Sequence, residues 1–330
     1  MTRNIKEFVN HNASTRAAHV EYSSDHVCVL LAHYNGATFL PEQLASLAAQ
    51  SHRDWSLIIS DDGSSDDWLD VASGFAETGA PGRTWLIAGP RQGYARNFLS
   101  LLKVAGPFVP FVAFCDQDDV WMENKLARAV AALKELPAGR PALYCSRTII
   151  CDRNLCSQRV SPRFSLAPSF GNALVQNIGG GNTMVMNRAA LDLVQDTLRH
   201  AKGIVSHDWW VYQLVSGSGG TVIFDQTPSL YYRQHGCNLV GANDTIWGSV
   251  SRLGKVFAGR YQRWNSANTA ALMRARHWLT PEARKTLALF TDARSGAAPK
   301  RLRALRLSGV YRQTRRGSIA LWLAALTKRL

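Results

Sequence analysis

The chain has 330 residues, 46% of them hydrophobic and 19% charged, and ten tryptophans, so it has enough apolar side chains for a large core and is not a disordered chain. Its formal net charge of +14 is unevenly distributed. Residues 250–330 contain 18 Lys and Arg and only two acids, Glu282 and Asp292, whereas the preceding residues hold 20 basic and 22 acidic side chains. This asymmetry predicts that the tail meets an anionic surface, either phospholipid or nucleic acid.

The N-terminal residues 1–25 form a polar leader, which we expect to be disordered and which lacks the apolar core of a signal peptide. No run of about 18 uncharged apolar residues occurs, so no transmembrane helix is expected. The six cysteines form no CxxC pair, which argues against a zinc ribbon or a thioredoxin-like site. We therefore expect reduced thiols in a cytoplasmic protein.

Strand and helix patterns alternate through residue 136. Apolar runs predict buried strands at 27–32, 55–60, 84–89 and 108–115. Leucines at helical spacing predict helices at 38–50, with Thr38 as the N-cap, and at 94–104 and 121–136. This alternation predicts parallel strands joined by helical crossovers. The later elements that we expect are strands at 142–150, 221–225 and 229–235, a Gly-rich loop, short strand and helix within 178–194, and helices beyond 245.

Three polar loops each follow a predicted strand directly: HYNG (33–36), SDDGSSDD (60–67) and CDQDD (115–119). In open α/β sheets, ligands bind beyond the carboxyl ends of the strands, so these loops are expected to meet at one edge of the sheet. Five or more carboxylates would converge there. Like charges that lie close together raise each other's pKa and destabilise the fold, and a bound cation would offset this cost.

The stretch FVAFCDQDDVW (111–121) places Asp116, Asp118 and Asp119 at the end of an apolar strand. Carboxylates at i and i+2 suit a hard divalent ion, Mg²⁺ or Mn²⁺, that keeps water and phosphate oxygens as further ligands. The alternative is a solvated acidic turn, but the apolar strand before the carboxylates and the helix after them favour a metal site.

The stretch SDDGSSDD admits two interpretations that are compatible with each other. Asp61 and Asp62 end a predicted strand, and either carboxylate could bond a base or a ribose. Ser64 or Ser65 could also cap a helix that runs through Trp68.

Four motifs in order, VCVLLAHYNGATFLPEQLASLAAQ, LIISDDGSSDD, GPRQGYARN and FCDQDDVW, resemble the nucleotide-sugar-binding half of glycosyltransferase family 2. The resemblance covers about residues 26–240, and the spaced set is specific although no single piece is. It implies an α/β GT-A fold with a mostly parallel central sheet flanked by helices. The composition of residues 241–330 adds a basic helical C-terminal region. DQDDVW and YYRQHGCN (231–238) look most like bacterial rhamnosyltransferases of surface-polysaccharide assembly, and the missing QxxRW box argues against a processive synthase.

The resemblance also implies roles for single residues. Ala32, Tyr34 and Asn35 would line the nucleotide pocket, and Asp61 or Asp62 would contact the uracil or thymine ring. Gly93, Arg96 and Asn97 would lie in the loop that contacts the nucleoside and the donor sugar. Asp116 would approach the ribose, and Asp119 would lie near the donor sugar. Asp118 would be the principal metal ligand, helped by Asp116. A plain surface charge on a helix is the alternative for Arg96.

The motif SHDWW (206–210) lies where members of the family carry a catalytic carboxylate, often in a Glu-Asp pair, and here the pair is His207-Asp208. Asp208 would be the general base that takes the proton from an acceptor hydroxyl as its oxygen attacks the anomeric carbon. The alternative is an N-cap of the helix that follows. We expect Trp209 and Trp210 in the core rather than on a sugar-stacking surface.

Two further segments complete the expected site. The motif GGGN (179–182) lets the backbone approach a ligand, so Gly180, Gly181 and Asn182 are expected to form a floor for the donor or acceptor sugar, with a plain tight turn as the alternative. Arg233 could neutralise the diphosphate leaving group, and His235 could offer a neutral imidazole to the metal.

The C-terminal segment 300–330 places apolar residues between basic ones, among them Ile319, Leu321, Trp322, Leu323 and Leu326. This composition suits a helix at an anionic membrane interface, and a packed or oligomer-forming helix is the alternative. We expect a metal-dependent inverting enzyme, peripheral on the inner face of the bacterial plasma membrane. It would transfer L-rhamnose or another sugar from a dTDP- or UDP-sugar to a lipid-linked or saccharide acceptor.

Two other functions stay open. One is a catalytically inactive sugar-nucleotide-binding or scaffold protein. The other is a nucleic-acid-binding protein that acts through the basic tail, but the sequence offers no set of base-stacking aromatic residues, so no nucleic-acid partner is expected.

Overall fold

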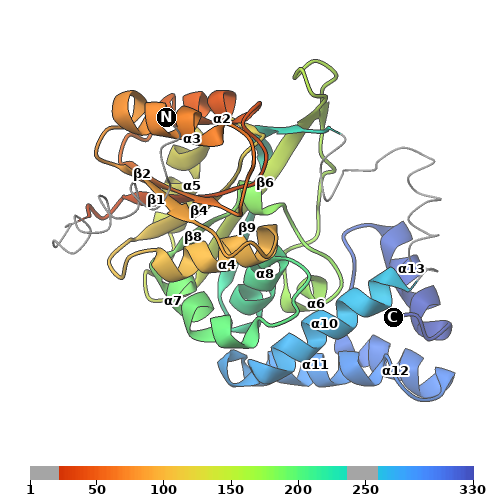
Figure 1. Cartoon of the computed structure of the whole chain (residues 1–330). Helices are drawn as coiled ribbons and strands as arrows, with labels where there is room; N and C mark the ends of the chain where they lie inside the picture. The colour runs from red at the N-terminus through yellow and green to blue at the C-terminus, as the bar shows by residue number, and fades with distance from the viewer. Residues whose placement is uncertain (1–21, 236–258) are drawn as a thin grey trace.

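A computed structural model of the chain describes residues 22–235 and 259–330 (Figure 1). The predicted leader lies mostly outside the described residues, as does Cys237. The five cysteines within 22–235 are free thiols, as predicted. Among the described helices, none combines the length and the apolar character that a bilayer crossing requires.

The described residues form one nine-stranded sheet with the order β3-β2-β1-β4-β8-β6-β9-β5, and β7 pairs with β6. Its strands are β1 (Val27–His33), β2 (Trp55–Asp61), β3 (Thr84–Ala88), β4 (Phe111–Asp116), β5 (Val120–Trp121), β6 (Ala142–Cys151), β7 (Arg159–Val160), β8 (Val185–Asn187) and β9 (Thr221–Arg233). The segment from β3 to β4 is parallel, as the strand and helix alternation predicted. Beyond β4 the sheet is mixed, because β8 runs antiparallel to both β4 and β6.

Helices cover both faces of the sheet (Figure 1). The described α-helices are α2 (Leu40–Ala48), α3 (Trp68–Gly74), α4 (Tyr94–Val104), α5 (Lys125–Lys134), α6 (Phe170–Ala173), α7 (Arg188–Thr197), α8 (His207–Gly217), α10 (Arg260–Arg274), α11 (Pro281–Asp292), α12 (Ala298–Ser308) and α13 (Arg315–Leu326). Alternate residues of β1 face opposite sides, since side chains of a strand point up and down in turn. Val29 and Leu31 pack with α2, α3 and α5, whereas Cys28 and Leu30 pack with α4, α7 and α8.

The C-terminal helices pack onto the body of the protein rather than forming a detached tail. Leu272, Phe290, Leu305 and Leu321, from α10 to α13, are buried in the same apolar cluster as Trp210 of α8. One continuous core therefore holds the α4, α7 and α8 layer and the basic C-terminal region together.

Two of the predicted elements differ in the structure. The expected strands at 221–225 and 229–235 form the single strand β9, whose pairing with β6 shifts between Ser146 and Arg147. This shift accommodates Pro228, which has no N–H for a regular ladder. The helix expected from residue 121 begins at Lys125 instead, because Val120 and Trp121 form β5 against β9.

The predicted helix caps are wrong. Phe39, not Thr38, occupies the N-cap position of α2, and its side chain makes no capping bond. Asp67 occupies the N-cap position of α3, so neither Ser64 nor Ser65 caps that helix. The hydroxyl of Ser64 bonds instead to the carboxylate of Asp61, which draws it away from the helix.

Candidate active site

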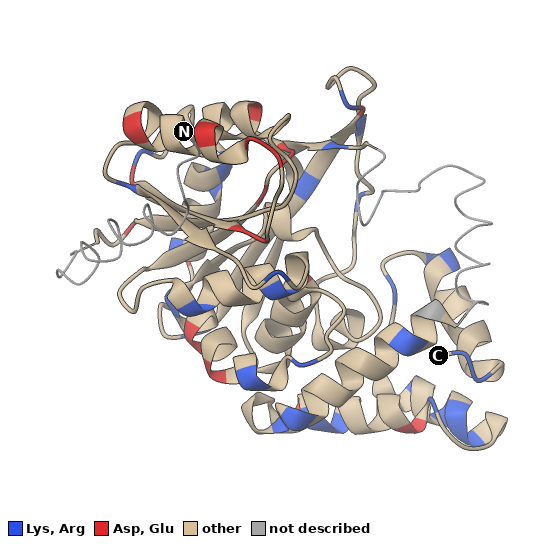
Figure 2. Cartoon of the chain, in the orientation of Figure 1, with Lys and Arg blue, Asp and Glu red and all other residues tan. Residues whose placement is uncertain are grey.

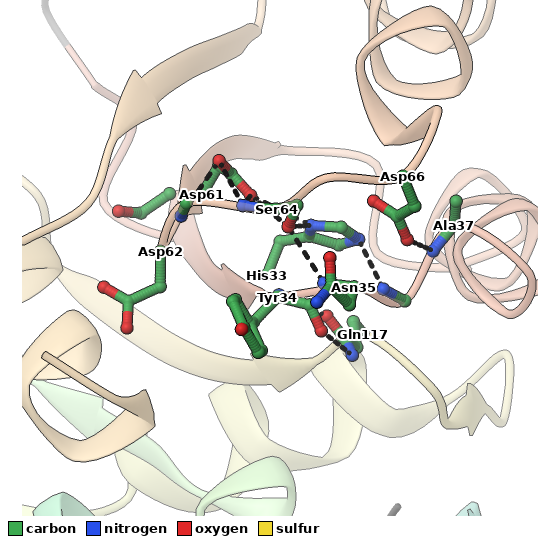
Figure 3. Close-up of polar contacts among 12 residues, drawn as sticks. His33, Tyr34, Asn35, Ala37, Asp61, Asp62, Ser64, Asp66 and Gln117 are labelled. Atoms are coloured by element: carbon green, nitrogen blue, oxygen red, sulfur yellow. Dashed lines mark hydrogen bonds and ion pairs between the residues drawn. The ribbon is translucent and has the colours of Figure 1, made fainter. Parts of the chain in front are cut away.

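The three polar loops meet at the carboxyl edge of the parallel strands, as predicted (Figure 3). The backbone N–H of Asn35 donates to Ser64 Oγ at 2.9 Å, which joins the loops after β1 and β2. Gln117 joins the loop after β4 to the same place, because its amide accepts from Tyr34 N at 2.7 Å and donates to Tyr34 O at 3.0 Å. Tyr34 itself is 57% exposed, so its ring is open to solvent at this edge.

Asp61 is buried at the end of β2 and is bonded on several sides. Its carboxylate accepts from the backbone N–H groups of Gly63 and Ser64 at 3.1 Å and lies 3.3 Å from Nδ1 of His33. Burial alone would raise the pKa of Asp61, but the bonds from His33, Ser64 and Gly63 outweigh it and hold the pKa below its usual range. The carboxylate is therefore ionised and shapes the turn after β2.

Asp62 organises the neighbouring loop GPRQG. Its Oδ1 accepts from the N–H of Arg91 at 2.7 Å, and its Oδ2 accepts from the N–H of Gly93 at 2.6 Å. Gly93 has a φ of 86°, which L-residues with a side chain rarely adopt. Asp62 thus fixes the loop that leads into α4, and in Figure 3 its carboxylate points away from the group around His33.

The two residues predicted on α4 differ in burial. Asn97 is buried, donates to the backbone oxygen of Ser60 at 2.8 Å and accepts from the Ser60 hydroxyl, so it ties α4 to β2. Arg96 is half-buried on the same helix. The first residue of α4, Tyr94, was not predicted: burial and the charges of Asp208 and Asp116 raise its pKa to about 12. Its position directly after Gly93 is the sequence signal that could have identified it.

The carboxylates of CDQDD are crowded, as the sequence predicted. Asp119 is fully buried, and its Oδ2 accepts from Asn182 Nδ2 at 2.5 Å while its Oδ1 has no hydrogen-bond partner among the described residues. Asp118 Oδ2 lies 2.8 Å from Nε2 of His235. Burial, followed by the charges of Asp118 and Asp208, raises the pKa of Asp116 to about 8.

This donor set fits a hard divalent ion only in part. Asp116 and Asp118 offer oxygen ligands of the kind that Mg²⁺ and Mn²⁺ prefer, and Asp119 adds a buried oxygen that no described residue hydrogen-bonds. Within residues 22–235 and 259–330, however, no three His, Cys, Asp or Glu side chains are grouped as a metal site. Because His235 bonds Asp118, phosphate and water oxygens would have to complete the coordination shell.

Lys125 is a cation near these carboxylates that the sequence analysis did not identify. Its side chain is fully buried, and its Nζ lies 3.7 Å from the centre of the Trp121 ring with no hydrogen-bond partner in the described part of the chain. Burial lowers the pKa of Lys125 to about 7, although the charges of Asp119 and Asp116 favour its protonated form. Its helical spacing is that of an ordinary surface lysine, so the sequence carried no sign of this burial.

Asp208 lies beside the Gly-rich loop. Ser206 occupies the N-cap position of α8, so the N-cap alternative for Asp208 is wrong. Asp208 Oδ2 accepts from the N–H of Gly181 at 3.1 Å, and the charge of Asp208 is one of those that raise the pKa of Asp116. The structure therefore brings Asp208 to the edge where CDQDD lies, about 90 residues earlier in the sequence.

His207 explains why a glycine is required at position 181. A Cβ on Gly181 would lie 2.5 Å from His207 Nε2. The imidazole is buried and stacks on Phe98 with ring centres 3.9 Å apart, and neither ring nitrogen has a described hydrogen-bond partner. Burial lowers the pKa of His207 to about 4, so the ring is neutral. Trp209 and Trp210 are buried in the core, as predicted.

Arg233 lies beneath the CDQDD loop. It is only 3% exposed, donates through Nε to the backbone oxygen of Asp118 at 2.9 Å, and forms an ion pair with Glu42 of α2. It also donates to the backbone oxygen of Arg153. These bonds hold the metal-ligand candidate Asp118 against two neighbouring segments.

A comparison with known protein families shows which family this site resembles. Residues 28–183 match the family described as Glycosyl transferase family 2. The chain carries a glycosyltransferase family 2 domain. The matched region begins within β1 and ends in the Gly-rich loop, so it contains all three polar loops and the GGGN motif.

Curated relatives within this glycosyltransferase group are similar over larger parts of the chain. The dTDP-rhamnosyl transferase RfbG of Shigella flexneri is 28% identical over 233 residues, which cover 68% of this chain and 78% of RfbG. The UDP-Glc:alpha-D-GlcNAc-diphosphoundecaprenol beta-1,3-glucosyltransferase WfgD of Escherichia coli is 28% identical over 167 residues, which cover 50% of this chain and 62% of WfgD.

Solved structures support the fold of this family 2 chain. The 1–349 fragment of TarS from S. aureus superposes with a TM-score of 0.51 at 15% identity, covering 92% of this chain and 90% of the fragment. The same fragment in complex with UDP-GlcNAc gives a TM-score of 0.51 at 14% identity. This chain spans about half, 53%, of a longer TarS structure. The predicted fold class, a GT-A fold with a basic helical C-terminal region, is therefore confirmed.

Proposed function

We propose that the chain is an inverting glycosyltransferase that moves a sugar from a dTDP- or UDP-sugar to a hydroxyl of a saccharide or lipid-linked acceptor. The observation that carries the proposal is that Asp208 accepts a bond from Gly181, while the next residue, Asn182, donates to Asp119 of the CDQDD loop. A carboxylate beside those expected to hold a divalent ion, and through it the donor diphosphate, would take the proton from an acceptor hydroxyl.

The donor and acceptor classes that we propose are taken from the names of the relatives. RfbG is named for dTDP-rhamnosyl transfer, and WfgD for transfer from UDP-Glc to a sugar on diphosphoundecaprenol. TarS has been solved with UDP-GlcNAc. We therefore propose a pyrimidine nucleoside diphosphate sugar as the donor, with L-rhamnose as the first sugar to test, and a lipid-linked acceptor on the inner face of the plasma membrane.

In the proposed mechanism, Asp208 takes the proton from the acceptor hydroxyl as the oxygen attacks the anomeric carbon and the bond to the diphosphate breaks. The N–H of Gly181 donates to one oxygen of the Asp208 carboxylate, and this bond orients the group. A single displacement of this kind inverts the anomeric configuration. General-base catalysis of this type contributes roughly 10²–10⁴-fold to the rate.

The loops after β1 and β2 would hold the nucleotide, with Ala32, Tyr34, Asn35 and Asp61 closest to it. A divalent ion, when bound by Asp118 and Asp116, would neutralise the negative charge that builds on the leaving diphosphate. Arg96, half-buried on α4, would contact the nucleoside or the donor sugar.

Thermal unfolding in the presence of nucleotides tests this proposal. The midpoint should rise with dTDP or UDP, and rise further with Mg²⁺ or Mn²⁺, because ligands that bind only the folded state stabilise it. GDP at the same concentration serves as the control nucleotide. A donor screen with a lipid-linked oligosaccharide acceptor should then give transfer. If no nucleoside diphosphate raises the midpoint and the chain binds DNA tightly, the proposal is wrong.

A further inference from the structure

The last helix, α13, has two apolar faces. One face docks on the body through Leu321, Ala324 and Ala325, which are buried in the main apolar cluster. The other face leaves four large apolar side chains between 39% and 61% exposed, and these are Ile319, Trp322, Leu323 and Leu326. Their spacing of three and four residues places them on one stripe along the helix. An exposed apolar stripe of this size marks an interaction site.

The stripe continues into a hollow of about 600 Å³ beside α13. Ile319 and Trp322 line this hollow together with Leu166 and the guanidinium-bearing Arg315. The side chain of Gln313 bonds both the N–H and the oxygen of Leu166, at 3.1 and 2.9 Å. The apolar surface is therefore held in place by hydrogen bonds from two distant segments of the chain.

Cations flank the stripe at both ends. Arg315 and Arg316 are exposed at the N-terminal end of α13, and Lys328 is exposed just beyond its C-terminal end. Residues 293–330 contain ten Lys and Arg and no Asp or Glu. Figure 2 shows basic residues on the C-terminal helices, where few residues are acidic, and acidic residues mainly on the helices and loops at the top of the view and on α7.

The apolar stripe and the cations at its two ends together favour one of three possible partners. A second copy of the chain would bring the cations of both stripes together, and residues 293–330 offer no acidic side chain to pair with them. A nucleic acid would bind the cations but leave Ile319, Trp322, Leu323 and Leu326 in water. An anionic phospholipid surface offers negative headgroups and an apolar layer beneath them, so it satisfies both features.

We propose that α13 is a membrane-surface helix that lies in the headgroup layer of an anionic bilayer, with its apolar stripe inserted and Arg315, Arg316 and Lys328 against lipid phosphates. This proposal does not rest on the sugar-transfer reaction, and it can be tested in the absence of donor and acceptor.

Vesicle sedimentation of the full chain tests it. The chain should bind vesicles of phosphatidylglycerol and phosphatidylcholine in equal parts, should bind phosphatidylcholine alone far more weakly, and should be released by salt. The variant Ile319→Ser/Trp322→Ser/Leu326→Ser should lose binding. Arg315→Gln/Arg316→Gln should bind the anionic vesicles roughly thirtyfold more weakly, since each cation near the surface contributes about a fivefold factor.

Phe108→Ser is the matched control, because Phe108 is 70% exposed and lies outside the stripe. It should bind vesicles like the parent chain, and both Phe108→Ser and Arg315→Gln/Arg316→Gln should keep the parent's unfolding midpoint since these side chains are exposed. Undiminished binding of the triple-serine variant, or equal binding to neutral vesicles, would overturn the proposal. A dimer without lipid that becomes monomeric in the triple-serine variant would do the same, and would assign the stripe to a second copy.

Discussion

Asp208 Oδ2 accepts a hydrogen bond from the backbone N–H of Gly181 at 3.1 Å, which joins the start of α8 to the Gly-rich loop. This contact orients the candidate base, so replacing Asp208 with Asn removes the proton acceptor but preserves the size of the side chain. We expect the transfer rate to fall by roughly 10²–10⁴-fold. Stabilisation by dTDP or UDP should persist in a thermal unfolding assay. Asp192→Asn on α7 is the control, and retained turnover in Asp208→Asn would remove Asp208 as the base.

Gly181→Ala should damage both stability and activity. The new Cβ would lie 2.5 Å from His207 Nε2, and His207 cannot move freely because its ring is stacked on Phe98. Overpacking of this kind typically costs about 1–3 kcal/mol. The displaced loop would also lose the Gly181 bond to Asp208, so the turnover number should fall more than the affinity for nucleotide. Gly139→Ala, where nothing lies within 4 Å of the new Cβ, should behave as the parent chain in both measurements.

The buried His207 should make the free energy of unfolding depend on pH. Its folded-state pKa is about 4 against an ordinary value of 6.5, so the unfolded chain takes up the proton first as the pH falls. The stabilising contribution is therefore complete above about pH 6.5 and is lost toward pH 4, by up to about 1.4 kcal/mol per pH unit. Denaturant unfolding at pH 7 and pH 5 measures this loss. The variant His207→Asn should lose less free energy between the two pH values than the parent does.

The exposed His277 provides the control for this titration, because His277→Asn should keep the pH dependence of the parent chain. If the free energy of unfolding changes equally with pH in His207→Asn and in the parent, the pH dependence belongs to other groups.

Arg301 is expected to stabilise the packing of the C-terminal helices. It is buried, and it donates to the backbone oxygens of Ala325 and Leu326 at the end of α13 and to that of Gly296. Arg301→Met would leave these carbonyl groups without their donor, at a cost of about 1–3 kcal/mol for each that stays buried. The unfolding free energy should fall accordingly. Arg303→Met, on the exposed side of the same helix, should change it little; an equal loss in both variants would contradict this role.

The local sequence was sufficient to predict the parallel part of the sheet. The apolar runs at 27–32 and 55–60 correspond to β1 and β2 with one added residue each, and the helix expected at 94–104 is α4. These elements were predictable because each is buried on one or both faces, and burial leaves a periodic or continuous apolar pattern in the sequence. Where pairing across the sheet decided the structure, as at β5 and β9, local pattern was insufficient.

The residue types of the site were also evident from the sequence, since three polar loops follow three strands and parallel topology brings their ends together. The sequence did not reveal which side chains serve the scaffold. Asn97 ties α4 to Ser60, and Arg233 pairs with Glu42 nearly 200 positions away. Such pairs depend on how distant segments pack, and no local pattern encodes that packing.

What the sequence indicated by itself is the family resemblance, the parallel strands of the first half and the carboxylates at their ends. What only the tertiary structure decided is the meeting of Asp208 with the CDQDD loop, the burial of Lys125 beneath it, and the face of α13 that stays exposed. The physical reason is that these features arise from contacts between segments far apart in the chain. Composition predicted an interfacial helix within 300–330, but docking through Leu321, Ala324 and Ala325 decided which side chains remain available to a partner.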